Sequence, residues 1–140
     1  ETGKASDVGA SSCTTCQAGE YASASIAATS CIACPSGRYS YTAGVVGVAS
    51  CSECETGKAS DAGASLCTIC QTGKYASAST AATSCIACPS GRYSDAAMVT
   101  SCSACEAGKH SSVYGSISKN SCEPCPKGKG SNEGSSSCSS

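Results

Sequence analysis

The chain has 140 residues, of which 15 are Cys and none is Phe or Trp, and its formal net charge is −1. Large aliphatic side chains are too few to cover a sizeable hydrophobic core, so cross-links or metals must supply much of the stability. The balanced charge and the scarcity of aromatic rings argue against nucleic-acid binding. We also expect no membrane insertion in this segment, because no apolar run approaches the length that spans a bilayer.

Seven CxxC pairs follow one another along the chain. Their first cysteines are spaced 16 to 20 residues apart, which is typical of a tandem array whose units contact chiefly their neighbours. The pairs are Cys13/Cys16, Cys31/Cys34, Cys51/Cys54, Cys67/Cys70, Cys85/Cys88, Cys102/Cys105 and Cys122/Cys125, and Cys138 stands alone.

Each unit repeats the same local pattern. Gly stands three residues after the second Cys of every pair, which indicates a positive φ or a backbone packed too closely for a Cβ. Tyr most often stands two residues after that Gly, and turn-forming residues follow. Segments such as GRYS predict very short strands, and no stretch predicts a helix. The fold class predicted is therefore small and disulfide-rich: an elongated tandem array of short loop or β-hairpin modules with little regular secondary structure.

A longer duplication lies over these units. Residues 1–40 align with 55–94 without a gap, and 34 of the 40 positions are identical. The domain organisation predicted is a first three-unit segment at 1–54, a near-identical segment at 55–105, and a seventh and partial next unit at 106–140. We expect the chain to be part of a longer array.

Zinc binding and disulfide bonding both fit closely spaced CxxC pairs. The spacing overlaps that of zinc ribbons, but His110 is the sole nitrogen ligand, and seven pairs would leave one pair over after three four-thiolate sites. A Cys-dense chain with a small core is more typical of secreted proteins. We therefore expect no metal and no cofactor.

A simple count supports disulfides between successive pairs. If the second Cys of each pair bonds the first Cys of the next, fourteen cysteines are used and Cys13 is left to bond a residue before Glu1. Pairing within a CxxC remains the alternative. The expected bonds are Cys16–Cys31, Cys34–Cys51, Cys54–Cys67, Cys70–Cys85, Cys88–Cys102, Cys105–Cys122 and Cys125–Cys138.

The string C-P-S-G-R-Y-S…C, at Cys34–Cys51 and Cys88–Cys102, resembles the first submodule of tumour necrosis factor receptor cysteine-rich domains. It is more similar still to ephrin-receptor-like cysteine-rich repeats. The resemblance covers nearly the whole chain and implies the same bridges between successive pairs, with an extracellular or cell-surface location. Ala5 and Ala59 depart from the pattern, because they replace the aromatic residue.

No catalytic site is expected. His110 is the sole His, and the acidic residues are scattered singly, so we expect no enzyme. The residue after the repeated Gly is usually basic and could meet acidic glycans or acids of a neighbouring chain, such as Glu1, Glu55 and Glu106. These positions are Lys4, Glu20, Arg38, Lys58, Lys74, Arg92, Lys109 and Lys129.

The sequence thus favours a structural extracellular repeat protein, a disulfide-stabilised rod or filament that associates with itself head to tail or laterally. The alternative is a stalk or ligand-binding ectodomain segment of a cell-surface receptor or adhesin. Attached glycans are also expected, with Ser135, Ser136 and Ser137 as candidate O-glycosylation sites.

Overall fold

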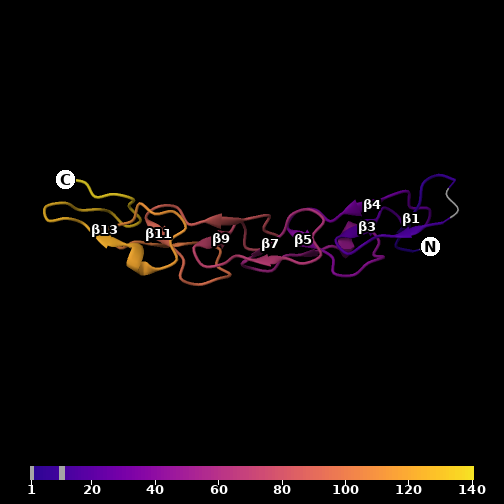
Figure 1. Ribbon diagram of the computed structural model, residues 1–140, viewed down its shortest axis with the longest axis horizontal. Helices are drawn as coiled ribbons and strands as arrows, with labels where there is room; N and C mark the ends of the chain where they lie inside the picture. Colours follow the sequence, from indigo (N-terminus) through magenta and orange to yellow (C-terminus); the bar gives the residue numbers. More distant parts are fainter. Residues whose placement is uncertain (1, 10–11) are drawn as a thin grey trace.

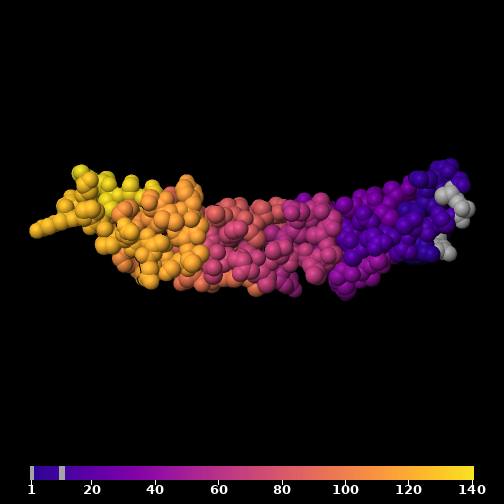
Figure 2. Space-filling view, viewed as in Figure 1, coloured from indigo at the N-terminus to yellow at the C-terminus, as the bar shows by residue number. Residues whose placement is uncertain are grey.

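The molecule is elongated, and its two termini lie at opposite ends of the long axis (Figure 1). The structure, a computed structural model, describes residues 2–9 and 12–140. The space-filling view shows successive parts of the sequence following one another along the length (Figure 2). Segments therefore contact mainly segments that are near in sequence, which confirms the predicted elongated array of short modules.

Short hairpins are the repeated element of the fold. The described residues form seven two-stranded antiparallel sheets, each joining the strand after a repeated glycine to the strand at the next CxxC. The pairs are β1 (Lys4–Ala5) with β2 (Thr14–Thr15), β3 (Glu20–Ala22) with β4 (Cys31–Ala33), β5 (Arg38–Tyr39) with β6 (Ser52–Glu53), β7 (Lys58–Ala59) with β8 (Thr68–Ile69), β9 (Lys74–Ala76) with β10 (Cys85–Ala87), β11 (Arg92–Tyr93) with β12 (Ser103–Ala104), and β13 (Lys109–His110) with β14 (Glu123–Pro124). Two three-residue 3-10 helices, η1 (Val48–Ser50) and η2 (Lys119–Ser121), lie in the longest loops.

A tight turn places the repeated glycine at the start of each hairpin. The N–H of Arg38 donates to the carbonyl oxygen of Pro35 at 3.0 Å, and Gly37 between them has a φ of 80°. A positive φ at the third residue is the requirement of a type II turn, which favours Gly. The carbonyl of Gly37 then accepts from the N–H of Cys54 at 2.9 Å, so glycine and second cysteine form one corner.

A loop from two units further along fits into that corner. The N–H of Ala81 donates to the carbonyl oxygen of Cys54 at 2.9 Å, and a methyl group built at Gly37 would overlap the carbonyl oxygen of Ala81. We call the loop residue the tip and the Gly–Cys pair the corner. The same tip-in-corner contact recurs at Gly44 on Gly3 and Cys16, Gly63 on Gly19 and Cys34, Met98 on Gly57 and Cys70, Gly115 on Gly73 and Cys88, and Gly134 on Gly91 and Cys105.

Adjacent units are also bonded to each other. The N–H of Gly37 donates to the carbonyl oxygen of Ser60 at 2.8 Å, and the N–H of Gly91 donates to that of Ser111 at 2.6 Å. These bonds cross the boundaries at 54/55 and 105/106. The three segments expected from the sequence are therefore stretches of one continuous stack.

Sulfur and small side chains fill the interior. The largest fully buried side chains are all cysteines. Two equivalent clusters gather alanines around a cysteine, one at Ala5, Cys16, Ala22 and Ala28 and the other at Ala59, Cys70, Ala76 and Ala82. Tyr21, Tyr39, Tyr75 and Tyr93 are only half-buried.

Disulfides connect successive CxxC pairs throughout the described chain. They join residues 13 to 17 apart in sequence, and the chain-entropy model assigns about 3 kcal/mol to a loop of that size. The bonds are Cys16–Cys31, Cys34–Cys51, Cys54–Cys67, Cys70–Cys85, Cys88–Cys102, Cys105–Cys122 and Cys125–Cys138.

Peptide mapping without reductant tests this connectivity. We expect linked peptides that join the second Cys of one pair to the first Cys of the next, such as Cys54 to Cys67. Partial reduction and alkylation before digestion would separate bonds that share a peptide. Peptides closed by a bond within one CxxC, such as Cys67–Cys70, would contradict the arrangement.

Substitution of a corner glycine should disrupt the stack. Gly37→Ala should lower the free energy of unfolding by about 2 kcal/mol or more, because overlap with the Ala81 carbonyl adds to the cost of a positive φ. Gly63→Ala is the matched control, since its φ is 76° but its new methyl group would make an ordinary contact with Ala33. Denaturant unfolding followed by tyrosine fluorescence, with disulfides intact, measures the difference. Equal losses in both variants would contradict close packing at Gly37.

Candidate functional site

A charged side chain begins the first strand of each of the seven described hairpins, and several of these side chains have partners within the chain. Lys58 Nζ lies 2.8 Å from Glu55 Oε2, across the type II turn. Glu106 forms ion pairs with two lysines: its Oε2 lies 3.3 Å from Lys109 Nζ, and its Oε1 lies 2.6 Å from Lys119 Nζ. The acids that the sequence suggested for a neighbouring chain, Glu55 and Glu106, are thus engaged internally, and Glu1 lies outside the described residues.

These ion pairs change the pKa values of their members. The hydrogen bond and charge of Lys119, followed by those of Lys109, lower the pKa of Glu106, and Lys58 lowers that of Glu55 in the same way. A lowered pKa in the folded state means that the pair stabilises the fold above the ordinary carboxyl pKa of 4.5 and stops doing so as the pH falls through the folded value. The side chains of Glu55 and Glu106 are exposed, so solvent screens this contribution strongly.

The two arginines of the duplicated decapeptide CIACPSGRYS have different partners. Arg38 lies opposite Glu53 in the β5–β6 hairpin, and its Nη2 is 2.5 Å from Glu53 Oε1. Arg92 lies opposite Ala104 in the β11–β12 hairpin and donates through Nη1 to the carbonyl oxygen of Cys102 at 3.1 Å. The same local sequence therefore carries one neutralised and one available guanidinium group.

Two hollows place a tyrosine beside the basic residue of the following unit. The smaller, about 90 Å³, lies between Tyr39 and Lys58 and includes Glu55. The larger, about 240 Å³, lies between Tyr75 and Arg92. The cation can bind a small anionic group while the tyrosine ring offers an apolar face to the rest of a ligand, and the second hollow has no acid in its lining.

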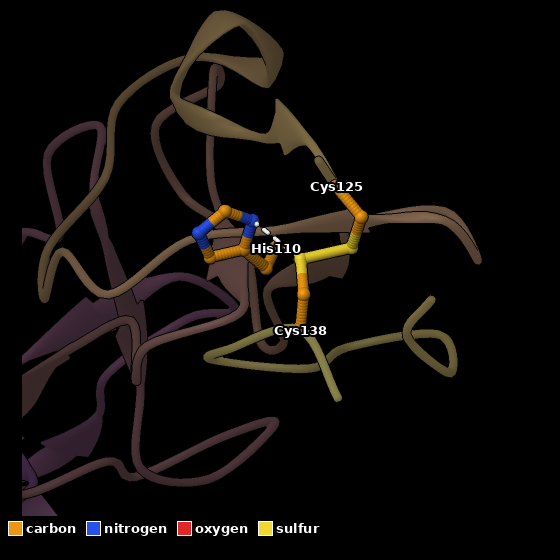
Figure 3. Close-up of side chains that lie close together, drawn as sticks. All are labelled: His110, Cys125 and Cys138. Atoms are coloured by element: carbon orange, nitrogen blue, oxygen red, sulfur yellow. Dashed lines mark hydrogen bonds between the residues drawn. A yellow bond between two sulfur atoms is a disulfide. The ribbon is translucent and has the colours of Figure 1, made fainter. Parts of the chain in front are cut away.

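His110 stands at the tyrosine position of its unit and contacts the last disulfide. Its Nδ1 lies 3.1 Å from Cys138 Sγ, and Cys138 is bonded to Cys125 (Figure 3). The ligand atoms of these three side chains lie within 4.8 Å of one another. In this arrangement the two sulfur atoms are joined to each other, so they do not offer the thiolates that a zinc site uses.

The structure brings together the cysteines in the pairs expected from the sequence. Cys13 is a free, exposed cysteine. Ser136 and Ser137 are exposed, whereas Ser135 is half-buried and its carbonyl oxygen accepts from the N–H of Ser111 at 3.2 Å.

The loop tips are structural positions that the sequence reasoning missed. Ala27, Ala81 and Met98 have positive φ values although they carry side chains. Their equivalents in other units are the glycines Gly9, Gly44, Gly63, Gly115 and Gly134. That glycine enrichment was a usable signal, but loops of unequal length hid it.

Residues 3–51, 57–105 and 73–122 match the family described as tyrosine-protein kinase ephrin type A/B receptor-like. The chain belongs to this family. The matches cover most of the chain and confirm the ephrin-receptor-like resemblance seen in the sequence, while the similarity to tumour necrosis factor receptors is consistent with these modules and stays a prediction. No curated protein matches the chain.

Membership in the ephrin-receptor-like family fixes the broad class of the protein. The family is one of receptor-like cysteine-rich modules and not an enzyme family. Together with the dense disulfides, it places the chain outside the cell or on its surface, in a segment that resembles a receptor ectodomain. In the described ranges, no helix has the length and apolar character needed to cross a membrane.

The shared carboxylate of Glu106 is open to a direct test. Lys119→Ala should raise the pKa of Glu106 part of the way to its ordinary value, because the strongest hydrogen bond is lost while Lys109 remains. Carbon NMR of the glutamate carboxyl groups against pH would measure the midpoint. Lys127→Ala removes the same charge elsewhere and should leave the midpoint unchanged; an equal shift in both variants would contradict the pairing.

Proposed function

We propose that the chain is a structural extracellular repeat protein, a disulfide-stabilised rod segment that associates with itself head to tail. The observation that carries this proposal is the tip-in-corner contact, which joins each unit to the unit two places along. A contact that repeats with the same groups can continue from one molecule to the next, and open-ended contacts of this kind build filaments.

Two corners and one tip have no partner among the described residues, and we infer that groups of this kind take part in the association. Nothing in the described chain lies within 4 Å of a Cβ built at Gly108 or at Gly128, which hold the corner position in their units. The tip residue Gly9 is likewise uncovered and has a φ of 84°. By the spacing of the internal contacts, Gly9 of one copy fits Gly108 of another.

The duplicated organisation belongs to the same proposal. Segments 1–54 and 55–105 would present equivalent surfaces at intervals along a rod, followed by the units of 106–140. Equivalent surfaces also favour lateral contacts between rods in a constant register. The exposed Ser136 and Ser137 would be available to O-linked sugars, and Ser135 less so because it is half-buried.

A receptor stalk or ligand-binding ectodomain segment is the second candidate. It is favoured by the receptor-like family to which the chain belongs. In that case the stack would act as a spacer within one longer molecule, and self-association would not be needed.

Electron microscopy and light scattering of the oxidised protein would separate the two candidates. The rod proposal expects particles that lengthen with concentration. Gly108→Ala should reduce this association by at least about tenfold, because a methyl group at an equivalent internal corner overlaps the incoming carbonyl oxygen.

Gly63→Ala is again the control, because it carries a positive φ without such an overlap. It should leave the association unchanged. A monomer at all concentrations would favour the stalk and contradict self-assembly.

A further inference from the structure

The hollow beside Arg92 is the most specific unassigned feature of the surface. It measures about 240 Å³ and is lined by Tyr75, Pro89, Arg92, Thr100, Ser101 and Cys102. Sites for drug-sized ligands are usually 300 Å³ or larger, so this one suits a single small ring. Its lining combines one cation, one phenol ring and two aliphatic hydroxyl groups.

The guanidinium group of Arg92 is held in place but not neutralised. Its Nη1 donates to the carbonyl oxygen of Cys102, and no carboxylate of the described chain lies within ion-pair distance. Asp95, three residues further along, makes no ion pair with it. The remaining N–H groups can therefore meet a carboxylate in the paired geometry that arginine favours.

The duplicated copy provides an internal comparison. Arg38 occupies the same place in the same decapeptide, but Glu53 on the facing strand binds its guanidinium group. At the position equivalent to Glu53, the second copy has Ala104. One substitution on the neighbouring strand thus decides whether this arginine is available to a ligand.

The other lining residues indicate which kind of ligand would bring a carboxylate group to Arg92. Tyr75 is half-buried, so part of its ring remains open as a flat apolar surface. The hydroxyls of Thr100 and Ser101 can both donate and accept hydrogen bonds. A pyranose ring offers an apolar C–H face for the tyrosine and hydroxyl groups for the threonine and serine.

We propose that the hollow between Tyr75 and Arg92 binds the carboxylate of an acidic sugar, with the sugar ring against Tyr75. Two sources share this chemistry, a terminal sialic acid and a hexuronic acid. This proposal does not depend on self-association, since the hollow lies within one chain.

NMR titration of the isotopically labelled, oxidised chain tests the site. The probes are sialyllactose, digalacturonic acid and neutral lactose. At least one acidic sugar should shift the Arg92 Nε–H and Tyr75 ring signals in a saturable way, whereas Arg38 should not respond. The acidic sugar that responds identifies the source. Equal shifts with lactose, or no saturable shift with either acidic sugar, would overturn the proposal.

Two variants of equal net charge sharpen the test. Ala104→Glu should reduce the affinity at least about tenfold, because it recreates the partner that Glu53 provides to Arg38. Ser103→Glu adds the same charge on the opposite face of β12 and should change the affinity less than about threefold. Equal losses in both variants would mean general charge attraction and would overturn the site.

An acidic peptide is the competing ligand. A tetraglutamate peptide should give no saturable shift at Tyr75, because it has no ring to pack there. Saturable binding of that peptide, with the same loss in Ala104→Glu, would overturn the assignment to a sugar. Unchanged signals from the other hairpins and unchanged disulfide maps would establish that each variant is folded.

Discussion

The structure depends on one close approach, in which the carbonyl oxygen of a loop tip lies directly over a glycine two units away. A side chain on that glycine would occupy the same space as the oxygen. The N–H of the same tip donates to the carbonyl oxygen of the corner cysteine, as Ala81 does to Cys54. The N–H of the tip is thus bonded to the preceding unit and its carbonyl oxygen is packed against the glycine of that unit, so the contact sets the distance and orientation between units and leads to an elongated stack.

Disulfide bonds stabilise this stack of units in place of a core of large hydrophobic side chains. The buried side chains are cysteine, alanine and serine, which are too small to stabilise a chain of this length by burial alone. Each bridge closes its own loop and so limits the freedom of the unfolded chain where it is placed. Each unit buries only a few small side chains, so the hydrophobic contribution of any one unit to stability is small. Small side chains are therefore a requirement of the stack: a large residue at Ala22 or Ala76 would hold neighbouring units apart.

The surface is where duplicated segments have diverged. Ion pairs at Glu55 and Glu106 neutralise several of the basic side chains that the sequence places after each glycine. Arg92 differs, because the facing strand carries alanine and not glutamate. A repeat array can acquire one distinct binding site in this way, without altering the backbone contacts that hold its units together. Ligand recognition would then use side chains at the beginning of a strand, such as Arg92. Contacts between units use main-chain groups.

Much of the fold was determined by the sequence alone. The CxxC spacing, the glycine three residues later and the 34 identities of the duplication predicted the tandem array, its short strands and a set of cysteine pairs that the structure also has. Local chemistry suffices for the turns, because a type II turn needs glycine, whereas the cysteine pairs were expected from a count of the cysteines and from the family resemblance, with pairing within a CxxC left open. Only the tertiary structure decided which loop fits which glycine, since that contact joins residues more than 40 positions apart through backbone atoms that carry no sequence signal. It also decided the difference between Arg38 and Arg92: both lie in the same ten-residue sequence, and the residue that separates their chemistry lies on another strand.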